Sequence, residues 1–510
     1  MCEHGMGPVS DSDSQIADDA VDDCGVSPSV WRFANASRAH AVIDAAPYFD
    51  MMRDAMLNAR QRILLIGWDF DTRILIGRGR RWWNVPRHDV PPARLGPFML
   101  WLANRNPNLE ICVLKWNFGA LRAFFRGSMM FDLIRWWRHP QIHFKLDSAH
   151  PIGCSHHQKI VVIDDKFAVC GGIDMAGDRW DTREHLEGDL RRHRPTGRLY
   201  GPWHDCTMML EGDVAKALGD YGRVRWKQAG GKPMKACQPQ DESPWPARLK
   251  AEFENLTVGV SRTRSQYNNL RPIREVEALF VQQILRARRF IYIENQYFAS
   301  RRIAEAIALR LAEPDPPEIV LVTPLSSEGW LEQTAMDGAR IRLIHAIRDA
   351  DHHGRFSVFC PYNAAGTPIY VHSKLMIVDD EILRIGSSNM NNRSLGLDSE
   401  CDVFIDASLS ENGSCGPAIK RLRLSLLAEH CGISSADAQA LLDVHGSMAA
   451  MIDAADKSGK HLRKFQLRPM SEAEKAIADN AVFDPEAPEE MLRLYRRRGL
   501  FRSLILRRPQ

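Results

Sequence analysis

The chain has 510 residues, of which 45% are hydrophobic and 26% are charged, and its formal net charge is +3. This length exceeds what one hydrophobic core usually supports, so two cores or one duplicated core are expected. The small net charge argues against bulk nucleic-acid binding, which calls for a strong positive excess.

The first 29 residues are rich in acidic side chains, poor in apolar ones and without a signal-peptide pattern, so we predict a disordered tail. No window offers the roughly 18 uninterrupted apolar residues of a membrane-spanning helix. The eleven cysteines are odd in number and scattered, which indicates reduced, buried thiols rather than a disulfide framework. The sequence therefore predicts a cytoplasmic protein whose membrane contact is peripheral.

Helical and strand-like stretches alternate in two regions, 30–228 and 259–433. In the first region the predicted helices are 46–58, 97–104 and 121–137, and the predicted strands are 63–68, 109–114 and 143–146. In the second the predicted helices are 274–288, 303–312 and 331–350, and the predicted strands are 290–294, 318–323 and 357–360. Such alternation is typical of a mostly parallel sheet covered by helices. We therefore predict an α/β fold of two similar α-β-α sandwich halves, an internal duplication with mixed, mostly parallel sheets.

Two further segments complete the domain organisation. Residues 229–258 are rich in glycine and proline and have little periodicity, which predicts a linker. Residues 434–510 are predicted to form a helical, basic C-terminal extension. It begins with a helical pair over 434–457 that breaks at 445–446. Arginines alternate with apolar residues over 491–508, and such a segment either lies on an anionic lipid surface or docks on the protein body.

Each half contains a His, a Lys two residues later and an Asp seven residues later: His157, Lys159 and Asp164, then His372, Lys374 and Asp379. Continuous apolar runs between Lys and Asp predict strands buried on both faces. Alternate residues of a strand point the same way, so His and Lys face one side at its leading end. A second strand then leads to Gly171-Gly172 or Gly386-Ser387, where a phosphate can approach the backbone.

Displacement at a phosphodiester needs a nucleophile, a proton for the departing oxygen and cations for the charge on the other oxygens. Two His and two Lys from facing halves of one chain supply all of these. The motif therefore predicts a shared active site that needs neither a metal ion nor another cofactor.

With these residues the chain resembles the phospholipase D superfamily, whose signature is this duplicated motif followed by a Gly-Gly or Gly-Ser loop. Blocks at 179–182, 202–205, 225–226 and 291–298 resemble the phosphatidylcholine-type branch. The resemblance extends over about residues 30–432.

The resemblance implies that His157 attacks phosphorus to give a phosphohistidine. His372 would protonate the leaving alcohol and then activate water or an acceptor alcohol. The residues themselves indicate only that one histidine has each role, because their settings are alike. Lys159 and Lys374 would hold the phosphoryl oxygens.

Further polar residues complete the expected site: phosphate-binding Ser387 and Asn389, and orienting carboxylates Glu400, Asp189 and Asp174. A nucleophilic imidazole needs its other nitrogen held by an acceptor. Glu400 matches the acidic partner of the family, and Asp189 is the candidate in the first half. Asp174 stands where the second half has Asn389, which suits an orienting role.

The motif aspartates Asp164 and Asp379 complete the catalytic signature. Their place after the strand favours a turn or hydrogen-bonding role over contact with phosphorus.

The resemblance implies hydrolysis of the distal phosphodiester of glycerophospholipids at a membrane surface, giving phosphatidate and a free headgroup, with possible transfer to an alcohol acceptor. A phosphatidyltransferase of the cardiolipin-synthase kind is the alternative, and a nuclease is a third possibility. The small net charge disfavours a nucleic-acid partner. A lipid-binding module without catalysis is disfavoured because all six signature residues are present.

Overall fold

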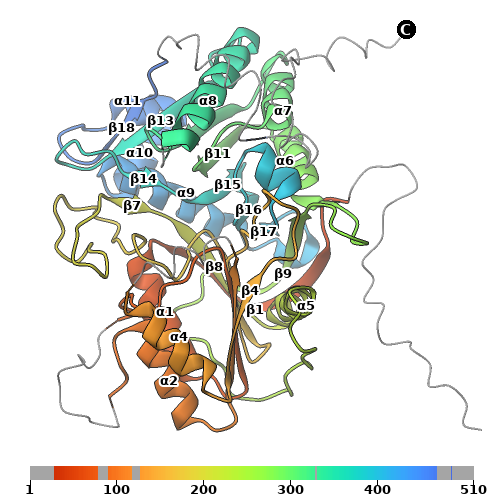
Figure 1. Ribbon diagram of the computed structural model, residues 1–510. Helices are drawn as coiled ribbons and strands as arrows, with labels where there is room; N and C mark the ends of the chain where they lie inside the picture. Colours follow the sequence, from red (N-terminus) through yellow and green to blue (C-terminus); the bar gives the residue numbers. More distant parts are fainter. Residues whose placement is uncertain (1–27, 78–89, 118–126, 328–329, 468–483, 485–510) are drawn as a thin grey trace, which may run out of the picture.

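The computed structural model describes residues 28–77, 90–117, 127–327, 330–467 and 484. Its helices and strands form two α/β halves, the first half below and the second above in Figure 1.

In the first half the strands are β1 (Arg32–Ile43), β2 (Arg62–Gly67), β3 (Glu110–Trp116), β4 (Ile142–Asp147), β5 (Ile160–Ile163), β6 (Phe167–Gly171), β7 (Trp203–His204) and β8 (Cys206–Glu211). Its helices are α1 (Ala45–Leu57), α2 (Leu95–Arg105), α4 (Met129–Trp137) and α5 (Asp213–Gln228).

In the second half the strands are β9 (Phe253–Arg264), β10 (Ile273–Arg274), β11 (Phe290–Asn295), β12 (Glu318–Val322), β13 (Phe356–Tyr362), β14 (Tyr370–Val371), β15 (Lys374–Val378), β16 (Ile382–Gly386), β17 (Glu400–Asp406) and β18 (His461–Lys464). Its helices are α6 (Glu275–Arg286), α7 (Arg301–Leu311), α8 (Trp330–Ala350), α9 (Gly416–Cys431), α10 (Ser435–His445) and α11 (Met448–Ala454), with a π-helix at Arg393–Leu397 and a 3₁₀ turn at Ser410–Asn412.

One sixteen-stranded sheet runs through both halves, in the order β18-β13-β12-β11-β15-β16-β17-β9-β1-β8-β6-β5-β2-β3-β4, with β10 beside β9. Outward from the centre, β1-β8-β6-β5-β2-β3-β4 matches β9-β17-β16-β15-β11-β12-β13. The two central strands, β1 and β9, pair antiparallel from Arg32 opposite Val260 to Ala39 opposite Phe253. The predicted internal duplication is therefore present, with the two halves arranged about an approximate two-fold axis.

The predicted α/β class is confirmed, but two details of the sheet were wrong. The halves share one sheet, and in its described part only β2-β3-β4 and β11-β12-β13 pair in parallel. The motif strands β5 and β15 turn straight back into β6 and β16, which makes these pairs antiparallel. Asp164-Asp165 and Asp379-Asp380 form the two tight turns, with φ between 51° and 59°, a conformation that Asp tolerates better than most residues.

Alternation along the motif strands places each of them between two apolar layers. In β5, Ile160 and Val162 join a core shared by both halves, which α5 and α9 cover, whereas Val161 joins the core beneath α1 and α2. In β15, Leu375 joins the shared core and Met376 joins the core beneath α6, α7 and α8. This confirms the prediction of strands buried on both faces, and it holds the leading ends of β5 and β15 rigidly.

The C-terminal region differs in part from the prediction. The helical pair is present as α10 and α11, and Gly446 with φ 64° ends α10. β18 then adds an antiparallel strand to the edge of β13, so the extension is not wholly helical. β9 begins at Phe253, inside the segment predicted as a linker. The basic stretch 491–508 and residues 1–27 of the predicted tail lie outside the described residues.

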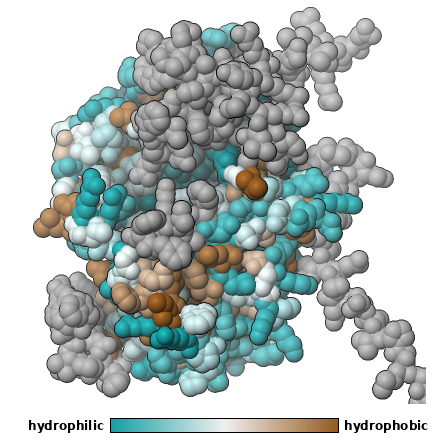
Figure 2. Space-filling view, in the orientation of Figure 1, coloured by the Kyte–Doolittle hydropathy of each residue, from teal (hydrophilic) through white to brown (hydrophobic). Residues whose placement is uncertain are grey.

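Among the described helices, none combines the length and the apolar character that crossing a membrane requires. Figure 2 shows a mainly hydrophilic surface on the visible described residues, with a smaller hydrophobic group over the first half.

Candidate active site

Both motif histidines line one pocket of about 320 Å³. His157 precedes β5 and His372 precedes β15, so the matched topology of the halves brings the leading ends of both motif strands to the same cavity. Aromatic rings flank each imidazole: the Trp68 ring lies 6.3 Å from that of His157, and the Trp203 ring lies 5.2 Å from that of His372. The pocket thus combines two imidazoles with apolar walls.

Each imidazole is held by a carboxylate from the opposite half. His157 Nδ1 lies 2.9 Å from Oε1 of Glu400, the first residue of β17. His372 Nδ1 lies 2.7 Å from Oδ2 of Asp205, which joins β7 to β8. Both carboxylates are fully buried. An Nδ1–H that donates to the carboxylate leaves Nε2 free to face phosphorus.

The approximate two-fold axis explains these crossed pairs. β8 and β17 occupy matching places in the sheet, so Asp205 and Glu400 are equivalent residues. Backbone hydrogen bonds also join each motif histidine to the opposite half: His157 N donates to Ser399 O at 3.0 Å, and His372 N donates to His204 O at 2.7 Å. Each half therefore supplies an imidazole and completes the imidazole of the other half.

Burial determines the protonation of the paired groups. It lowers the pKa of His157 well below 6.5, and the charges of Lys159 and Lys374 lower it further. It also lowers the pKa of His372 well below 6.5, with Lys374 adding to the effect. For the carboxylates, burial raises the pKa of Glu400 to about 8 and that of Asp205 to about 6. A buried imidazolium is therefore disfavoured in the empty pocket, and each imidazole is available as a base or nucleophile.

The two lysines are placed differently. Lys159 Nζ lies 3.1 Å from Oδ2 of Asp174 and donates to His157 O at 2.9 Å. Lys374 Nζ donates to His372 O and, at 2.9 Å, to Oε1 of Gln296. Burial lowers the pKa of Lys374 to about 7, although the charge of Asp205 opposes this shift. An anionic ligand beside Lys374 would therefore favour the charged form of this side chain.

Asp174 and Asn389, equivalent in sequence, have different contacts. Asp174 pairs with Lys159, and its Oδ1 accepts the backbone N–H groups of Trp68 and Asp69 at 3.1 and 3.3 Å. Asn389 lines the pocket, and its buried Oδ1 has no hydrogen-bond partner among the described residues. The acid therefore fixes a lysine, whereas the amide is available to a ligand.

Ser387 does not have the phosphate-binding position expected from the sequence. Its hydroxyl donates to Oε2 of Glu400, and its N–H donates to Oδ1 of Asp402 at 3.1 Å. Ser387 is absent from the residues that line the pocket. Its observed contacts fix the carboxylate that holds His157.

The motif aspartates lie at the far ends of the strands from the histidines. Asp164 accepts the backbone N–H groups of Arg60, Gln61 and Arg62 at 2.7 to 2.8 Å. Asp379 does the same for 288–290 at 2.7 to 2.9 Å. The prediction that these two aspartates are catalytic was therefore wrong. Asp164 holds the start of β2 and Asp379 holds the start of β11.

We predict that Asp164→Ala lowers the free energy of unfolding by about 3 kcal/mol, because three backbone donors lose a charged acceptor. Denaturant unfolding measures this loss. As a control, Asp189→Ala removes an ion pair with the exposed Arg191 and one backbone hydrogen bond, and should cost about 1 kcal/mol. Equal losses in the two variants would argue against this role of Asp164.

Asp189 is not at the site, contrary to the prediction. Its carboxylate pairs with Arg191 at 2.6 Å, and it is absent from the residues that line the pocket. The residue that fills its expected role is Asp205, within the block at 202–205 that already resembled the family. Distance in sequence from His157 could not identify it, because it serves the histidine of the other half.

Several further polar residues of the pocket were not assigned from the sequence, among them Arg179 and Gln296. Arg179 lines it, with its guanidinium carbon 4.4 Å from the centre of the Trp203 ring. Gln296 lines it and accepts from Lys374. Arg179 belongs to the block at 179–182 and Gln296 to the block at 291–298, both of which resembled the family. That resemblance was the only sequence signal that could have assigned these two residues to the site.

The fold and the site define a duplicated α/β protein with one paired-histidine centre built from both halves. The sequence model described as phospholipase D matches residues 55–304 and 362–478, and the one described as cardiolipin synthase, PLD-like domain, matches residues 280–412. The chain belongs to the phospholipase D family.

Several relatives come from plants and yeast. Phospholipase D alpha 1 of Nicotiana tabacum is 24% identical over 518 residues, which cover 74% of this chain and 63% of that protein. Phospholipase D1 of Saccharomyces cerevisiae is 25% identical over 496 residues, covering 77% of this chain and 28% of that protein. The chain thus spans less than two thirds of the length of these relatives.

Among solved structures, phosphatidylserine synthase of Haemophilus influenzae matches with a TM-score of 0.48 and 12% identity, covering 75% of this chain and 86% of that one. The phospholipase D family member Nuc of Salmonella typhimurium matches with a TM-score of 0.22 and 18% identity, covering 29% of this chain and 82% of that one.

Proposed function

We propose that the protein is a phospholipase D-type phosphodiesterase that hydrolyses the distal phosphodiester of glycerophospholipids to phosphatidate and a free headgroup alcohol. The observation that carries this proposal is the pair of buried imidazoles on one pocket, each held through Nδ1 by a carboxylate of the opposite half. Membership of the phospholipase D family supports the same reaction.

In the proposed reaction, Nε2 of His157 attacks phosphorus and the bond to the headgroup oxygen breaks. His372 gives its proton to that oxygen, and the phosphatidyl group remains on His157 as a phosphohistidine. His372 then takes a proton from water, the water oxygen attacks phosphorus, and the P–N bond breaks to release phosphatidate. The family resemblance suggests which histidine attacks, because the two settings are nearly symmetric.

The charges of the pocket suit this sequence of steps. A phosphodiester anion beside Lys159 and Lys374 offsets the positive charge that lowers the pKa of both imidazoles. Substrate binding therefore makes it easier for His372 to carry the proton that the departing oxygen needs. The guanidinium of Arg179 provides a further hydrogen-bond donor and positive charge on the pocket wall.

A lipid substrate fits the apolar parts of the pocket. Trp68, Trp116 and Met336 lie on its walls, next to the polar groups that would take the phosphate.

A phosphatidyltransferase that passes the phosphatidyl group to a lipid alcohol is the second candidate, because the cardiolipin-synthase sequence model matches residues 280–412. The two functions share the covalent step and differ in whether water or an alcohol attacks the phosphohistidine.

Incubation of the protein with mixed phospholipid vesicles, with and without ethanol, followed by lipid mass analysis, tests the proposal. Phosphatidate alone, and phosphatidylethanol when ethanol is present, are the expected products. Cardiolipin as the main product would favour the transferase. Inertness toward every lipid, with cleavage of DNA, would overturn both candidates.

Anion binding should weaken as pH rises, because deprotonation of Lys374 removes a cation from the site. Its pKa is about 7, and the nearby carboxyls of Asp205 and Glu400 have pKa values of about 6 and 8. The inhibition constant of dimethyl phosphate, an anion that does not titrate near neutrality, should therefore be lowest at pH 5.5 and rise by about tenfold or more per pH unit above pH 7. Competition assays from pH 5.5 to 9 measure this, with Lys374→Arg as the variant that stays charged. An inhibition constant unchanged up to pH 9 would exclude Lys374 as the titrating cation.

A further inference from the structure

A second group of buried titratable side chains lies outside the phosphate pocket. Asp44, His185, His204 and Glu429 form it, and we call it the buried cluster. Each of the four is buried, and they come from separate elements: the end of β1, the loop after β6, β7 and α9. The proposed phosphodiester reaction uses none of them.

The facing atoms of the buried cluster, which include both oxygens of Asp44, lie 3.1 to 3.7 Å apart. His204 Nδ1 is 3.2 Å from Asp44 Oδ1 and 3.2 Å from Glu429 Oε1. His185 Nε2 is 3.1 Å from Glu429 Oε1 and 3.7 Å from Asp44 Oδ2. Four ligands at about 2.0–2.1 Å around a tetrahedral metal ion are about 3.3–3.4 Å apart. The observed separations bracket this value.

Two atoms of the buried cluster have no hydrogen bond within the described part of the chain, His204 Nδ1 and Asp44 Oδ2. Both are in residues at most 1% exposed. His204 Nδ1 is near two carboxylate oxygens but satisfies hydrogen-bond geometry with neither. A ring nitrogen that faces the space between two oxygens suits a shared central ion better than a proton donated to either.

Both imidazoles have their outer nitrogen fixed by another carboxylate. His185 Nδ1 lies 2.9 Å from Asp181 Oδ2, and His204 Nε2 lies 2.8 Å from Glu294 Oε2. Histidines that bind metal ions almost always make such a contact through the second ring nitrogen, which fixes the ring and increases its basicity.

The charges around the buried cluster also call for a cation. Four carboxylates, those of Asp44, Asp181, Glu294 and Glu429, contact these imidazoles. Ion pairs with arginines reach two of them, Arg183 with Glu429 and Arg192 with Asp181, and a third imidazole, that of His430, lies 3.1 Å from Glu294. Buried charge must be paired. One divalent ion, or two protons held by the imidazoles, would supply the remaining positive charge.

We propose that the buried cluster binds one divalent transition-metal ion of the zinc type, with a structural role. Two nitrogen ligands disfavour Ca²⁺ and Mg²⁺, which prefer oxygen ligands, whereas two imidazoles and two carboxylates suit Zn²⁺. The sequence predicted a phosphate site without a metal ion, and this proposal leaves that site unchanged.

The ion would join the two halves beside the active site. Asp44, His185 and His204 belong to the first half and Glu429 to the second. His204 precedes Asp205, and its carbonyl oxygen accepts the N–H of His372. An ion on His204 would therefore fix the short segment that places a carboxylate on His372.

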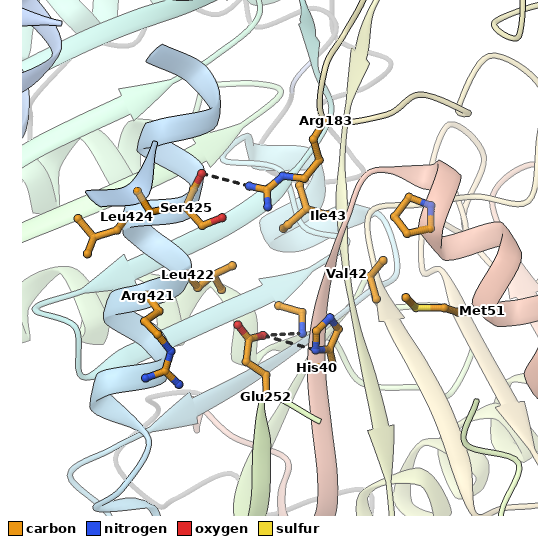
Figure 3. Close-up of a pocket in the computed structure, with 13 residues that line it drawn as sticks. His40, Val42, Ile43, Met51, Arg183, Glu252, Arg421, Leu422, Leu424 and Ser425 are labelled. Atoms are coloured by element: carbon orange, nitrogen blue, oxygen red, sulfur yellow. Dashed lines mark hydrogen bonds and ion pairs between the residues drawn. The ribbon is translucent and has the colours of Figure 1, made fainter. Parts of the chain in front are cut away.

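An adjoining cavity offers a route for the ion. Arg183 bonds Oε2 of Glu429 and lines an open pocket of about 510 Å³, together with His40 and Arg421. Figure 3 shows Arg183 extending toward α9, where its guanidinium also bonds Ser425 O at 3.1 Å. Rotation of this partly exposed side chain would open a path from the pocket to Glu429.

Metal analysis of the untagged, full-length protein by plasma mass spectrometry tests the proposal without relying on activity. We expect about one zinc per chain, reduced to less than a tenth in His185→Gln and in Glu429→Gln. The matched control, His143→Gln, changes an exposed histidine of β4 and should keep the full content. Zinc at the wild-type level in both cluster variants would overturn the proposal.

A measurement on the unsubstituted chain covers the case in which the variants do not fold. Protein produced in medium with cobalt in place of zinc should show the visible absorption of tetrahedral Co²⁺. Its thermal midpoint should fall by about 5 °C or more after prolonged chelation. Wild-type protein with neither zinc nor cobalt, and a midpoint that added Zn²⁺ does not change, would mean that two protons balance the charge and would refute the metal site.

Discussion

Replacing His157 or His372 with alanine is expected to lower turnover by roughly 10⁴-fold or more while the fold stays intact. Both steps of the proposed reaction need both imidazoles, one as the covalent carrier and one as the proton carrier. Both rings line the pocket, so their removal enlarges that pocket and does not leave a closed cavity in the core. Release of headgroup from phospholipid vesicles measures the rate, and thermal unfolding checks the fold.

Covalent trapping separates the two roles. With a labelled short-chain phosphatidyl ester of p-nitrophenol, whose leaving group departs without a proton from His372, His372→Ala should accumulate a phosphatidyl adduct on His157, because loss of the second base slows hydrolysis of the intermediate. His157→Ala should form no adduct. The exposed His143→Ala variant serves as control and should keep wild-type turnover. An adduct on His372 would exchange the two assignments, and substantial turnover in either histidine variant would contradict a shared site.

Asp205→Asn is expected to lower kcat by roughly 10³- to 10⁴-fold with little change in KM. The amide keeps the shape of the side chain but cannot stabilise a charged imidazole, and its NH₂ group can impose the wrong tautomer on His372. Glu400→Gln should have a comparable effect through His157, because the two pairs are equivalent.

Asp189→Asn provides a sharp control for the crossed pairs. Sequence spacing favoured Asp189 as the first-half carboxylate, whereas the structure pairs it with exposed Arg191. We expect turnover within about twofold of wild type. A large loss in Asp189→Asn together with an active Asp205→Asn would restore the sequence-based assignment.

The motif itself could be predicted from the sequence because its signals are local. Because alternate residues of a strand point to the same side, the sequence predicted that the side chains of His157 and Lys159 face one way. The second copy of the motif identified the equivalent residues of the other half. The carboxylate partners depend instead on the approximate two-fold axis. Glu400 follows the second motif but binds the histidine of the first. No spacing rule within one half describes a contact between halves, which is why Asp205 was missed.

Prediction of the strands was also limited to those that a local sequence pattern marks. Strands with continuous apolar runs, such as β2 and β11, were found close to their true bounds. The central strand β1 (Arg32–Ile43) was missed because polar and charged residues occupy much of its first part. β1 is a strand because its backbone pairs with β8 on one side and β9 on the other. The pattern of apolar residues in its own sequence does not indicate this.

The ladder between β1 and β9 has a consequence for how a lipid reaches the pocket. Seven residue pairs bond the halves edge to edge along the molecular centre. A clamp-like opening of the halves would break this ladder and the shared core beneath it. The two imidazoles are thus fixed at one spacing before any ligand arrives, so in the proposed reaction the lipid headgroup would have to leave the bilayer to meet them. Slow steps of turnover would then arise from lipid extraction and product escape, and changes in bilayer packing should alter the rate more than changes in solvent viscosity.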